Sequence, residues 1–274
     1  MPLEARSDPG TDDRAGRLYW DQAWESEDFP EDVDPRSPRI WAHRDQLFDG
    51  VFHTVLQGMP RPRLLELGCA RSAWLPYFAR EFGASVAGLD YSPLGVRQAE
   101  QRLQAAGVTG EVRCADLFTP PEDWRNAFDV VTWFGVAEHF DDATNAVRAA
   151  AAFLKPGGLL LTEIPNLSGV NGWLQRICNK AIYEIHVPHD RDGLVAHHRA
   201  AGLEIVLARY IVPMDFGVVE VGTGPATLSH ALKQRIMYGL RLLSGAVWLV
   251  DRRLPLPPTK ALSGFVIVAA RKPA

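Results

Sequence analysis

Acidic side chains follow several leucine-rich or β-branched runs of the sequence, at the positions where strands would end. Glu66 lies in RLLEL, Asp90 follows SVAGL, and Asp116 follows EVRCA. Ligands of an open parallel sheet bind beyond the carboxyl ends of its strands, so these carboxylates are expected at one crevice. Asp90 lies 22 positions after Gly68, close to the roughly 20-residue spacing at which an acid reaches the hydroxyls of a ribose. The pattern therefore predicts a nucleoside site.

The loop after the first of these runs, ELGCARS at 66–72, is poor in glycine. A pyrophosphate-binding loop needs the pattern G-x-G-x-x-G, which lets bare backbone approach two phosphates. Here Ala70 and Ser72 are small without being glycine, and Glu66 adds a negative charge that a pyrophosphate would not tolerate. A nucleoside with a zwitterionic amino-acid tail and a sulfonium cation fits this loop better than a dinucleotide does. That ligand is S-adenosyl-L-methionine.

The elements that would position these residues alternate along the chain from residue 63. Short strand-like runs are separated by helix-like segments, as in βαβ units with a mostly parallel sheet and helices on both of its faces. We therefore predict an α/β fold with a single core. The expected strands are 63–67, 84–90, 111–116, 128–134, 159–164, 203–212 and 264–272, and the expected helices are 72–83, 93–107, 145–158 and 190–201.

Three segments depart from this alternation. Residues 1–62 begin with a polar stretch and continue with tryptophans among acids and prolines, which is typical of an arm or lid docked on a core. Residues 165–189 and 212–262 interrupt the core and are expected to form a cap. The core domain is therefore predicted to comprise 63–211 and 263–272.

Taken together, LLELGCARS, VAGLDYSPLGVRQAEQRL, EVRCADLF, FDVVTWFGVAEHFDD and LKPGGLLLTEIPN resemble the class I S-adenosylmethionine-dependent methyltransferases of the small-molecule type. The first motif of that family is an acid followed by three glycines at alternate positions, of which this chain keeps the acid and the first glycine. The resemblance covers about residues 63–210 and the last strand. It implies a Rossmann-like, seven-stranded, mostly parallel sheet whose last strand is antiparallel.

The resemblance also implies roles for particular residues toward the cofactor. The backbone from Gly68 to Ala70 would lie against the methionyl tail, Asp90 would accept hydrogen bonds from the ribose hydroxyls, and Asp116 would bind the adenine amino group. Asp90 and Asp116 could instead be a helix cap and a turn residue. The pairing of Arg71 with the tail carboxylate is our own inference from its position. The expected cofactor-binding residues are Glu66, Gly68, Cys69, Ala70, Arg71, Asp90, Tyr91, Asp116, Leu117, Phe134 and Gly135.

The methyl acceptor is expected to be a small organic molecule whose reacting group is a hydroxyl. Orientation of the reactants can supply ~7–11 kcal/mol, so a catalytic dyad is not required. A base would still help, and the catalytic candidates are His139, His186 and His189. A structural hydrogen bond for His139, and a solvated loop for the other two, are the alternative interpretations. With a histidine base, turnover should fall as the pH drops through the histidine range, while cofactor binding should hold.

Other activities and ligands remain open at this point. They include N-methylation and a non-catalytic regulatory or partner subunit that binds S-adenosylmethionine, whereas Glu66 and the missing glycines argue against a nucleotide-dependent oxidoreductase. No metal site is predicted, because a proline interrupts the HxxH spacing at 186–189 and no third ligand is evident beside His197 and His198. An apolar lining of the acceptor pocket is expected from Trp173, Ile177, Tyr183, Phe216 and Trp248.

Composition and charge limit the partners. The net charge is −4, with 13 acids against 6 bases in residues 1–50 and 9 bases against 3 acids in residues 209–274. This balance disfavours a nucleic-acid binder. The chain contains no run of 18 apolar residues and no signal peptide is indicated, so the expected compartment is the cytoplasm. Cys69, Cys114 and Cys178 are unpatterned and fit reduced thiols.

One stretch of the second insertion, at about 226–250, has the spacing of an amphipathic and mildly basic helix. Two explanations are open: packing within the cap or a homodimer, and contact with a membrane surface or a lipid-linked substrate. The expected apolar stripe is Leu228, Leu232, Ile236, Leu240, Leu243 and Val247.

Overall fold

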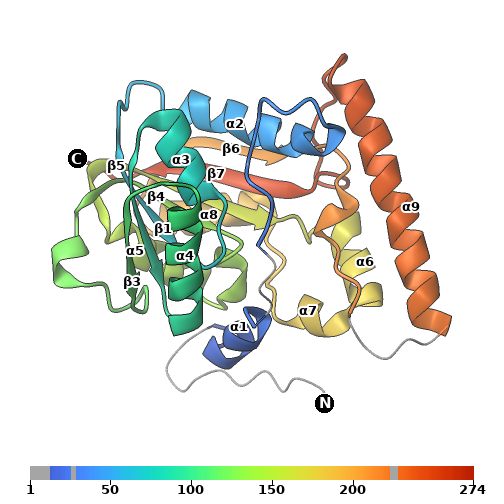
Figure 1. Ribbon diagram of the computed structural model, residues 1–274, viewed down its shortest axis with the longest axis horizontal. Coiled ribbons are helices and arrows are strands. Elements are labelled where there is room, and N and C mark those ends of the chain that lie inside the picture. Colours follow the sequence, from blue (N-terminus) through green and yellow to red (C-terminus); the bar gives the residue numbers. More distant parts are fainter. Residues whose placement is uncertain (1–12, 26–28, 223–227) are drawn as a thin grey trace.

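A seven-stranded sheet forms the centre of the molecule, with helices on both faces (Figure 1). The computed structural model describes residues 13–25, 29–222 and 228–274, and only the backbone of Leu228. The strand order is β3-β2-β1-β4-β5-β7-β6. The first five are parallel, and β7 is antiparallel to both of its neighbours, which confirms the predicted α/β fold. The strands are β1 Arg63–Leu67, β2 Ser85–Asp90, β3 Gly110–Cys114, β4 Phe128–Phe134, β5 Leu154–Pro165, β6 Glu204–Ile211 and β7 Phe265–Arg271.

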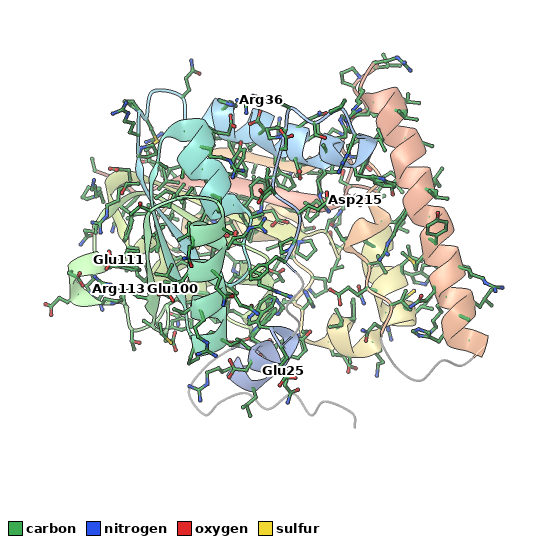
Figure 2. All side chains as sticks on the ribbon, viewed as in Figure 1. Glu25, Arg36, Glu100, Glu111, Arg113 and Asp215 are labelled. Carbon is green, nitrogen blue, oxygen red and sulfur yellow. The ribbon has the colours of Figure 1, made fainter. Side chains whose placement is uncertain are left out.

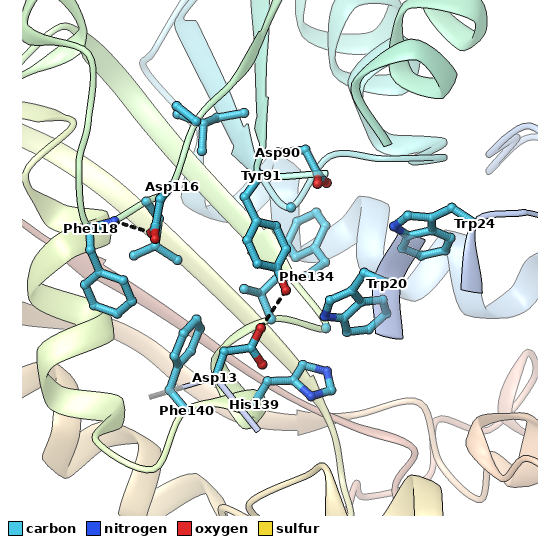
Figure 3. A pocket seen from close by; sticks show the side chains of 16 residues that line it. Asp13, Trp20, Trp24, Asp90, Tyr91, Asp116, Phe118, Phe134, His139 and Phe140 are labelled. Carbon is cyan, nitrogen blue, oxygen red and sulfur yellow. Dashed lines mark hydrogen bonds between the residues drawn. The ribbon is translucent and has the colours of Figure 1, made fainter. Parts of the chain in front are cut away.

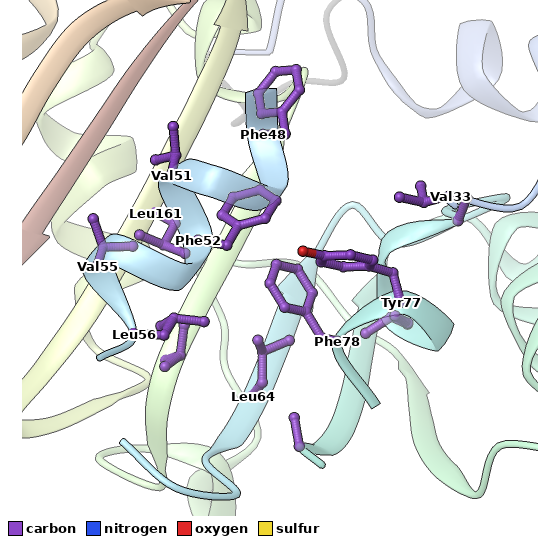
Figure 4. Close-up of a cluster of buried hydrophobic side chains, with 14 of the residues drawn as sticks. Val33, Phe48, Val51, Phe52, Val55, Leu56, Leu64, Tyr77, Phe78 and Leu161 are labelled. Atoms are coloured by element: carbon purple, nitrogen blue, oxygen red, sulfur yellow. The ribbon is translucent and has the colours of Figure 1, made fainter. Parts of the chain in front are cut away.

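The helices cover the two faces because successive residues of a strand point to opposite sides. Leu64 packs beneath α2, α3 and α4, whereas Leu65 packs beneath α5 and α8. Figure 4 shows part of the first of these clusters, to which Phe48 and Phe52 of α2 and Leu64 of β1 belong. Truncating a buried phenylalanine such as Phe52 to alanine should cost about 3–5 kcal/mol of stability. The helices are α1 Arg17–Ala23, α2 His43–Val55, α3 Trp74–Phe82, α4 Pro93–Ala105, α5 Ala143–Ala151, α6 Val170–Cys178, α7 Lys180–Glu184, α8 Arg191–Ala200 and α9 Leu228–Asp251.

The boundary between α5 and β5 differs from the one expected from the sequence. The helix ends at Ala151, and the strand begins at Leu154 rather than at residue 159. The segment KPGG belongs to the strand because its backbone pairs with the end of the chain: Gly157 N–H donates to the Lys272 carbonyl, and Lys272 N–H donates to the Gly158 carbonyl. The pairing of β4 with β5 shifts register in this region. A glycine-containing bulge was thus mistaken for the end of a helix.

The predicted arm divides into parts with different roles. Residues 43–55 are not a lid, because α2 is buried against the sheet. Residues 13–25, by contrast, cross the carboxyl ends of the strands: Asp13 forms a β-bridge with Phe140, and α1 lies near α4 (Figure 1). Residues 1–12 of the predicted arm lie outside the described residues.

The second insertion contains α9, which runs along one edge of the molecule (Figure 1). Asp215 lies at the junction with the sheet (Figure 2), and the neighbouring Phe216 N–H donates to Ser244 Oγ of α9. No helix among the described residues is long and apolar enough to cross a membrane. The first two positions of the predicted 226–250 stretch, and the side chain of Leu228, lie outside the described part of the chain.

Candidate active site

A cavity of about 220 Å³ lies beyond the carboxyl ends of β1, β2, β3 and β4 (Figure 3). Most of its wall comes from residues that directly follow these strands, as the strand-end pattern predicted. The arm closes one side with Asp13, Trp20 and Trp24. The complete lining is Asp13, Trp20, Trp24, Gly68, Leu89, Asp90, Tyr91, Ala115, Asp116, Leu117, Phe118, Phe134, Gly135, Val136, His139 and Phe140.

Asp90 is the buried carboxylate at the centre of this wall. Its Oδ2 accepts a hydrogen bond from Ala70 N–H at 3.1 Å, and its Oδ1 accepts one from Ser92 N–H at 2.9 Å. Burial raises its pKa to about 6, against the effect of these hydrogen bonds. The cap of α4 is Ser92, whose hydroxyl accepts from Gly95 N–H. Asp90 is therefore not needed as a cap, and each of its oxygens can accept a further hydrogen bond from a ligand.

Asp116 performs the local role that the alternative interpretation gave it and also lines the cavity. Its Oδ1 accepts from Phe118 N–H at 2.9 Å, which forms a turn after β3. This turn brings Leu117 and Phe118 to the wall, where the Phe118 ring meets Phe140 edge to face at 5.5 Å. The two interpretations of Asp116 are thus compatible in one geometry.

The arm supplies residues that the sequence analysis did not find. The Tyr91 hydroxyl donates to Asp13 Oδ2 at 2.6 Å (Figure 3), and the Trp20 and Trp24 rings stack at 5.3 Å. Asp13 is far from Tyr91 in the chain and belongs to no motif. The sequence around it contains other acids and gives no sign of this contact. Burial, reinforced by Asp13, raises the pKa of the Tyr91 hydroxyl well above its usual range.

The loop after β1 brings bare backbone to the cavity. Gly68 has φ +70°, and a Cβ at this position would lie 2.7 Å from the Val136 side chain, so both the conformation and the space require glycine. Cys69 is fully buried and lines neither cavity, which leaves only its backbone for a ligand. Burial raises the pKa of Glu66 to about 8, and its Oε2 has no hydrogen-bond partner among the described residues.

Arg71 is held by the arm. Its guanidinium lies over the Trp24 ring at 4.6 Å, and it donates a hydrogen bond of 3.5 Å to the Ala23 carbonyl. The side chain lines a second, larger cavity together with Ala70 and Ser72. Its predicted pairing with a ligand carboxylate stays a prediction.

The second cavity has a volume of about 1470 Å³ and adjoins the first, with part of the wall in common. The two share the wall residues Trp20, Trp24, Gly68, Phe134, Gly135 and His139. Its other walls come from the arm, α2, the segment 182–186 and the residues 217–220. Segments far apart in the sequence therefore enclose the larger cavity. The sequence analysis predicted an arm and a cap but not which of their residues form the wall.

Two of the three candidate histidines meet in this larger cavity. His139 and His186 have ring centroids 4.5 Å apart. Burial lowers the pKa of His139 to about 4, although the carbonyls of Ile185 and Gly135 act in the opposite direction. Burial and the nearby His139 lower the pKa of His186 to about 3. Both imidazoles are therefore neutral at pH 7.

His189 lies apart from these two. Its ring contacts His197 at 5.0 Å, and it lines neither cavity. His198 is buried and bonded to Thr162 Oγ1 and to the Leu194 carbonyl, so it belongs to the core. The three candidates therefore do not form one group, because the turn after α7 directs His186 toward β4 and His189 toward α8.

Buried acids also line the larger cavity. Glu138 is 2% exposed and Glu163 is 8% exposed. Burial raises the pKa of Glu163 to about 8, opposed by Arg44, and raises that of Glu138 well above its usual range, reinforced by Glu163. Each has one carboxylate oxygen without a hydrogen-bond partner among the described residues. Unpartnered buried acceptors are costly, so this wall is suited to a ligand that brings donors or positive charge.

The expected apolar lining was wrong for all five of its residues. Trp173 and Ile177 are exposed on α6, and Tyr183 does not line either cavity. Phe216 packs with Leu174 and Met237, and Trp248 is buried with its N–H donating to the Pro213 carbonyl. Phe216 therefore packs the two insertions against each other, and Trp248 attaches α9 to the core. The apolar part of the wall is instead Phe29, Trp41, Phe48, Trp74, Leu167, Ile182, Ile185, Val218 and Phe265.

Sequence comparison finds similar proteins for part of the chain. The family model described as a methyltransferase domain matches residues 40–208. The ubiquinone biosynthesis O-methyltransferase of Xanthomonas axonopodis pv. citri (strain 306) is 33% identical over 104 residues, which are 38% of this chain and 43% of the relative. The enzyme of the same name from Methylobacterium nodulans is 36% identical over 103 residues, or 38% and 41%. The matches thus span less than half of these relatives.

Solved structures share the fold at low sequence identity. Geranyl diphosphate C-methyltransferase from Streptomyces coelicolor A3(2), in complex with Mg²⁺, geranyl diphosphate and S-adenosyl-L-homocysteine, superposes with a TM-score of 0.59 at 16% identity, over 92% of this chain and 96% of that one. The [4+2]-cyclase SpnF gives 0.57 at 19% identity, over 88% and 84%. Neighbours with such different reactions show the fold alone.

Proposed function

The chain belongs to the class I S-adenosylmethionine-dependent methyltransferases, and from this premise we propose that it transfers a methyl group from S-adenosyl-L-methionine to a hydroxyl of a small organic acceptor. The observation that carries the proposal is the junction of the two cavities at Phe134, Gly135 and His139. A nucleoside-sized cavity and a larger one share these wall residues. A methyl group at the junction would face both.

The smaller cavity supports binding of the cofactor in one direction. Asp90 would accept from the ribose hydroxyls, Tyr91 and Leu117 would flank the adenine, and Asp116 would bind its amino group. The methionyl tail would follow the backbone from Gly68 to Ala70 toward Arg71. The cationic amino and sulfonium groups of the cofactor suit the unpartnered Oε2 of Glu66, whose ionisation they would favour.

The reaction is an in-line displacement. The acceptor oxygen forms a bond to the methyl carbon as the carbon–sulfur bond breaks, and the electron pair stays on sulfur, which gives S-adenosylhomocysteine. The hydroxyl proton passes to a base, and neutral His139 or His186 faces the cavity where the acceptor would lie. His189 remains the weakest of the three candidates because it lines neither cavity. Positioning by the cavity walls supplies the rest.

Binding and turnover test this proposal separately. Calorimetry should detect S-adenosylmethionine and S-adenosylhomocysteine, with NAD⁺ silent, and the reverse pattern would overturn the assignment. Transfer of labelled methyl to phenolic, sugar and lipid-linked hydroxyls should then identify the acceptor. If methyl is transferred only to amines, the proposal of O-methylation is wrong and the protein is an N-methyltransferase. Tight cofactor binding with no transfer to any acceptor would instead support a non-catalytic partner subunit.

We further propose that α9 brings the protein to an anionic lipid surface. The side of α9 that faces away from the core carries apolar residues that are 46–57% exposed. Residues 228–262 contain six lysines and arginines and only one acid, Asp251, so the charge favours an anionic surface over a second copy of the chain. The exposed apolar residues are Leu232, Ile236, Leu242, Leu243, Leu249 and Val250.

Vesicle sedimentation distinguishes the partners of α9. Binding to vesicles that contain phosphatidylglycerol, but not to pure phosphatidylcholine, is expected, and Ile236→Glu with Leu243→Glu should abolish it. Unchanged binding of that variant would contradict the proposal. A concentration-dependent dimer that the same variant dissociates would assign this face to a homodimer. The expected cytoplasmic compartment stays a prediction.

A further inference from the structure

Three side chains that could bind a metal ion line the larger cavity. Glu138 and His139 belong to the short helix Ala137–His139 after β4, and His186 follows α7. One potential ligand atom of each lies within 4.8 Å of those of the other two. We propose that Glu138, His139 and His186 form a binding site for a divalent transition-metal ion.

Each of the two imidazoles is held by a backbone carbonyl at its Nδ1. His139 Nδ1 lies 2.9 Å from the Ile185 carbonyl, and His186 Nδ1 lies 2.5 Å from the Ile182 carbonyl. A carbonyl oxygen only accepts, so each Nδ1 carries the proton and each Nε2 keeps its lone pair. Metal-bound histidines characteristically donate their other N–H to such a carbonyl or carboxylate. In each ring, Nε2 is therefore the nitrogen that remains available to a metal ion.

The carboxylate of the group lacks a partner. Glu138 is 2% exposed, and its Oε2 has no hydrogen-bond partner among the described residues. Its backbone is fixed to the same insertion, since Val187 N–H donates to the Glu138 carbonyl. Arg14 ties the group together from the arm by donating to the carbonyls of His139 and His186. A cation would satisfy the buried carboxylate that these contacts hold in place.

A second group of potential ligands among the described residues provides a contrast. Asp49, His53 and Glu81 are also within reach of one another. Arg36 pairs with both carboxylate oxygens of Glu81, and the Tyr77 hydroxyl donates to Asp49. The acids of this group already have hydrogen-bond partners within the protein. None of its three members lines either cavity. It therefore serves as a control.

The donor set indicates the class of metal. Two imidazole nitrogens and one carboxylate suit Zn²⁺, Co²⁺, Mn²⁺ or Fe²⁺, whereas Mg²⁺ and Ca²⁺ prefer oxygen ligands. Three protein ligands leave coordination positions open toward the cavity. On the proposed function, an acceptor hydroxyl bound there would lose its proton to water more readily, and with the metal bound the two imidazoles would act as ligands in place of the base. The oxygen would then form its bond to the methyl carbon as the carbon–sulfur bond breaks.

The test measures metal binding without turnover. The full chain is stripped with a chelator, dialysed and titrated with Co²⁺ and Zn²⁺, followed by visible absorption and calorimetry. One equivalent is expected to bind, with the absorption bands of nitrogen-ligated Co²⁺. His186→Gln and Glu138→Gln should each weaken binding at least about 100-fold, since changes to outer-shell partners alone cost 10–100-fold. His53→Gln is the matched control and should bind as the wild type does.

Three results would overturn the site: no binding by the wild type, binding that survives in both His186→Gln and Glu138→Gln, or binding lost in His53→Gln. Circular dichroism and thermal unfolding check that each variant folds, and Glu138→Gln preserves the shape of the side chain. S-adenosylhomocysteine affinity is measured on the same samples. If the wild type does not bind S-adenosylhomocysteine, the methyltransferase proposal is refuted and the metal result still stands. Full turnover by the stripped protein would refute the catalytic role of the metal and leave the methyltransferase proposal standing.

Discussion

The two cavities differ in how the chain builds them. The smaller one is walled mainly by residues that follow β1, β2, β3 and β4, and its acids are bonded to nearby backbone or to Tyr91. The larger one is enclosed by the arm, α2 and both insertions, and three of its acids have an oxygen without a partner. The first depends mainly on the core strands, whereas the second depends to a larger extent on the arm and the insertions. Cofactor and acceptor recognition can therefore change independently.

The buried titratable groups of the two cavities also differ in their charge at neutral pH. Asp90 has a pKa of about 6, so its carboxylate is ionised at pH 7. In the larger cavity the pKa values of Glu66 and Glu163 are about 8, and those of His139 and His186 are about 4 and about 3. Without a ligand, these four buried groups of the larger cavity are therefore uncharged at pH 7. A cationic ligand would ionise the acids there and gain the energy of pairing.

The largest effect is expected on the acceptor side. His186→Gln should lower turnover by about 10²–10⁴-fold, the range of a lost proton acceptor, while S-adenosylhomocysteine affinity stays unchanged. His189→Gln is the matched control, since His189 belongs to the same segment but lines neither cavity. Single-turnover rates and calorimetry on each variant provide the measurement. Equal loss in both variants would remove the distinction between the two histidines.

The next effect is expected on the cofactor side. Asp90→Ala removes two charge-assisted hydrogen bonds to the ribose, each contributing ~1.5–3 kcal/mol, so S-adenosylhomocysteine affinity should fall by about 100-fold or more. Calorimetry measures this. Asp90 also accepts from Ala70 and Ser92, so Asp90→Asn, which keeps the shape, is compared with it. Retention of wild-type affinity in both variants would mean that the ribose binds elsewhere.

The place of Asp90 and Asp116 in the wall of the smaller cavity could be predicted from the sequence because each lies at or just after the end of a strand. A strand alternates its faces and ends at one edge of the sheet, so position along the chain gives position in space. Asp13 and Trp20 could not be predicted in this way, because the arm returns to the site over a long loop. The sequence also left open which side of α9 packs on the core. Leu232, Ile236 and Leu243 are exposed, while Met237, Ser244 and Trp248 are buried, since a helix that is apolar on most sides does not reveal which side packs.

A pH titration sharpens the electrostatic contrast between the cavities. Cofactor binding was expected to hold through the histidine range, but the pKa of Asp90 of about 6 changes that expectation. If the ribose requires the carboxylate, S-adenosylhomocysteine affinity should fall by about tenfold for each pH unit below 6. The lowered pKa values of His139 and His186 keep both rings neutral across this range. Calorimetry from pH 5 to 8 measures it, with Asp90→Asn as the pH-independent control.

Protein stability should fall as the pH rises, whereas cofactor affinity should fall as the pH drops. Glu66 and Glu163 are protonated in the folded chain up to about pH 8, whereas their unfolded value is 4.5. Their contribution to the free energy of unfolding is therefore fully present below pH 4.5 and is lost as the pH rises toward 8. Glu163→Gln mimics the protonated acid and should reduce the fall in unfolding free energy between pH 6 and 8. Urea unfolding of the ligand-free protein measures this, and an unchanged slope would contradict the raised pKa.

The smallest effect is expected where the arm joins the two cavities. Trp24 stacks on Trp20, and its ring lies beneath the Arg71 guanidinium. A partly exposed cation–π contact contributes ~0.5–1 kcal/mol, so Trp24→Ala should speed cofactor release by about two- to fivefold. If the arm acts as a lid, association should quicken too and the equilibrium affinity should change little, which stopped-flow fluorescence can resolve. Trp173→Ala removes an exposed tryptophan of α6 that lines neither cavity and should leave both rates unchanged. If release from Trp24→Ala is as slow as from the wild type, residues 17–25 are a fixed wall of the site, and the difference between the cavities is one of construction alone.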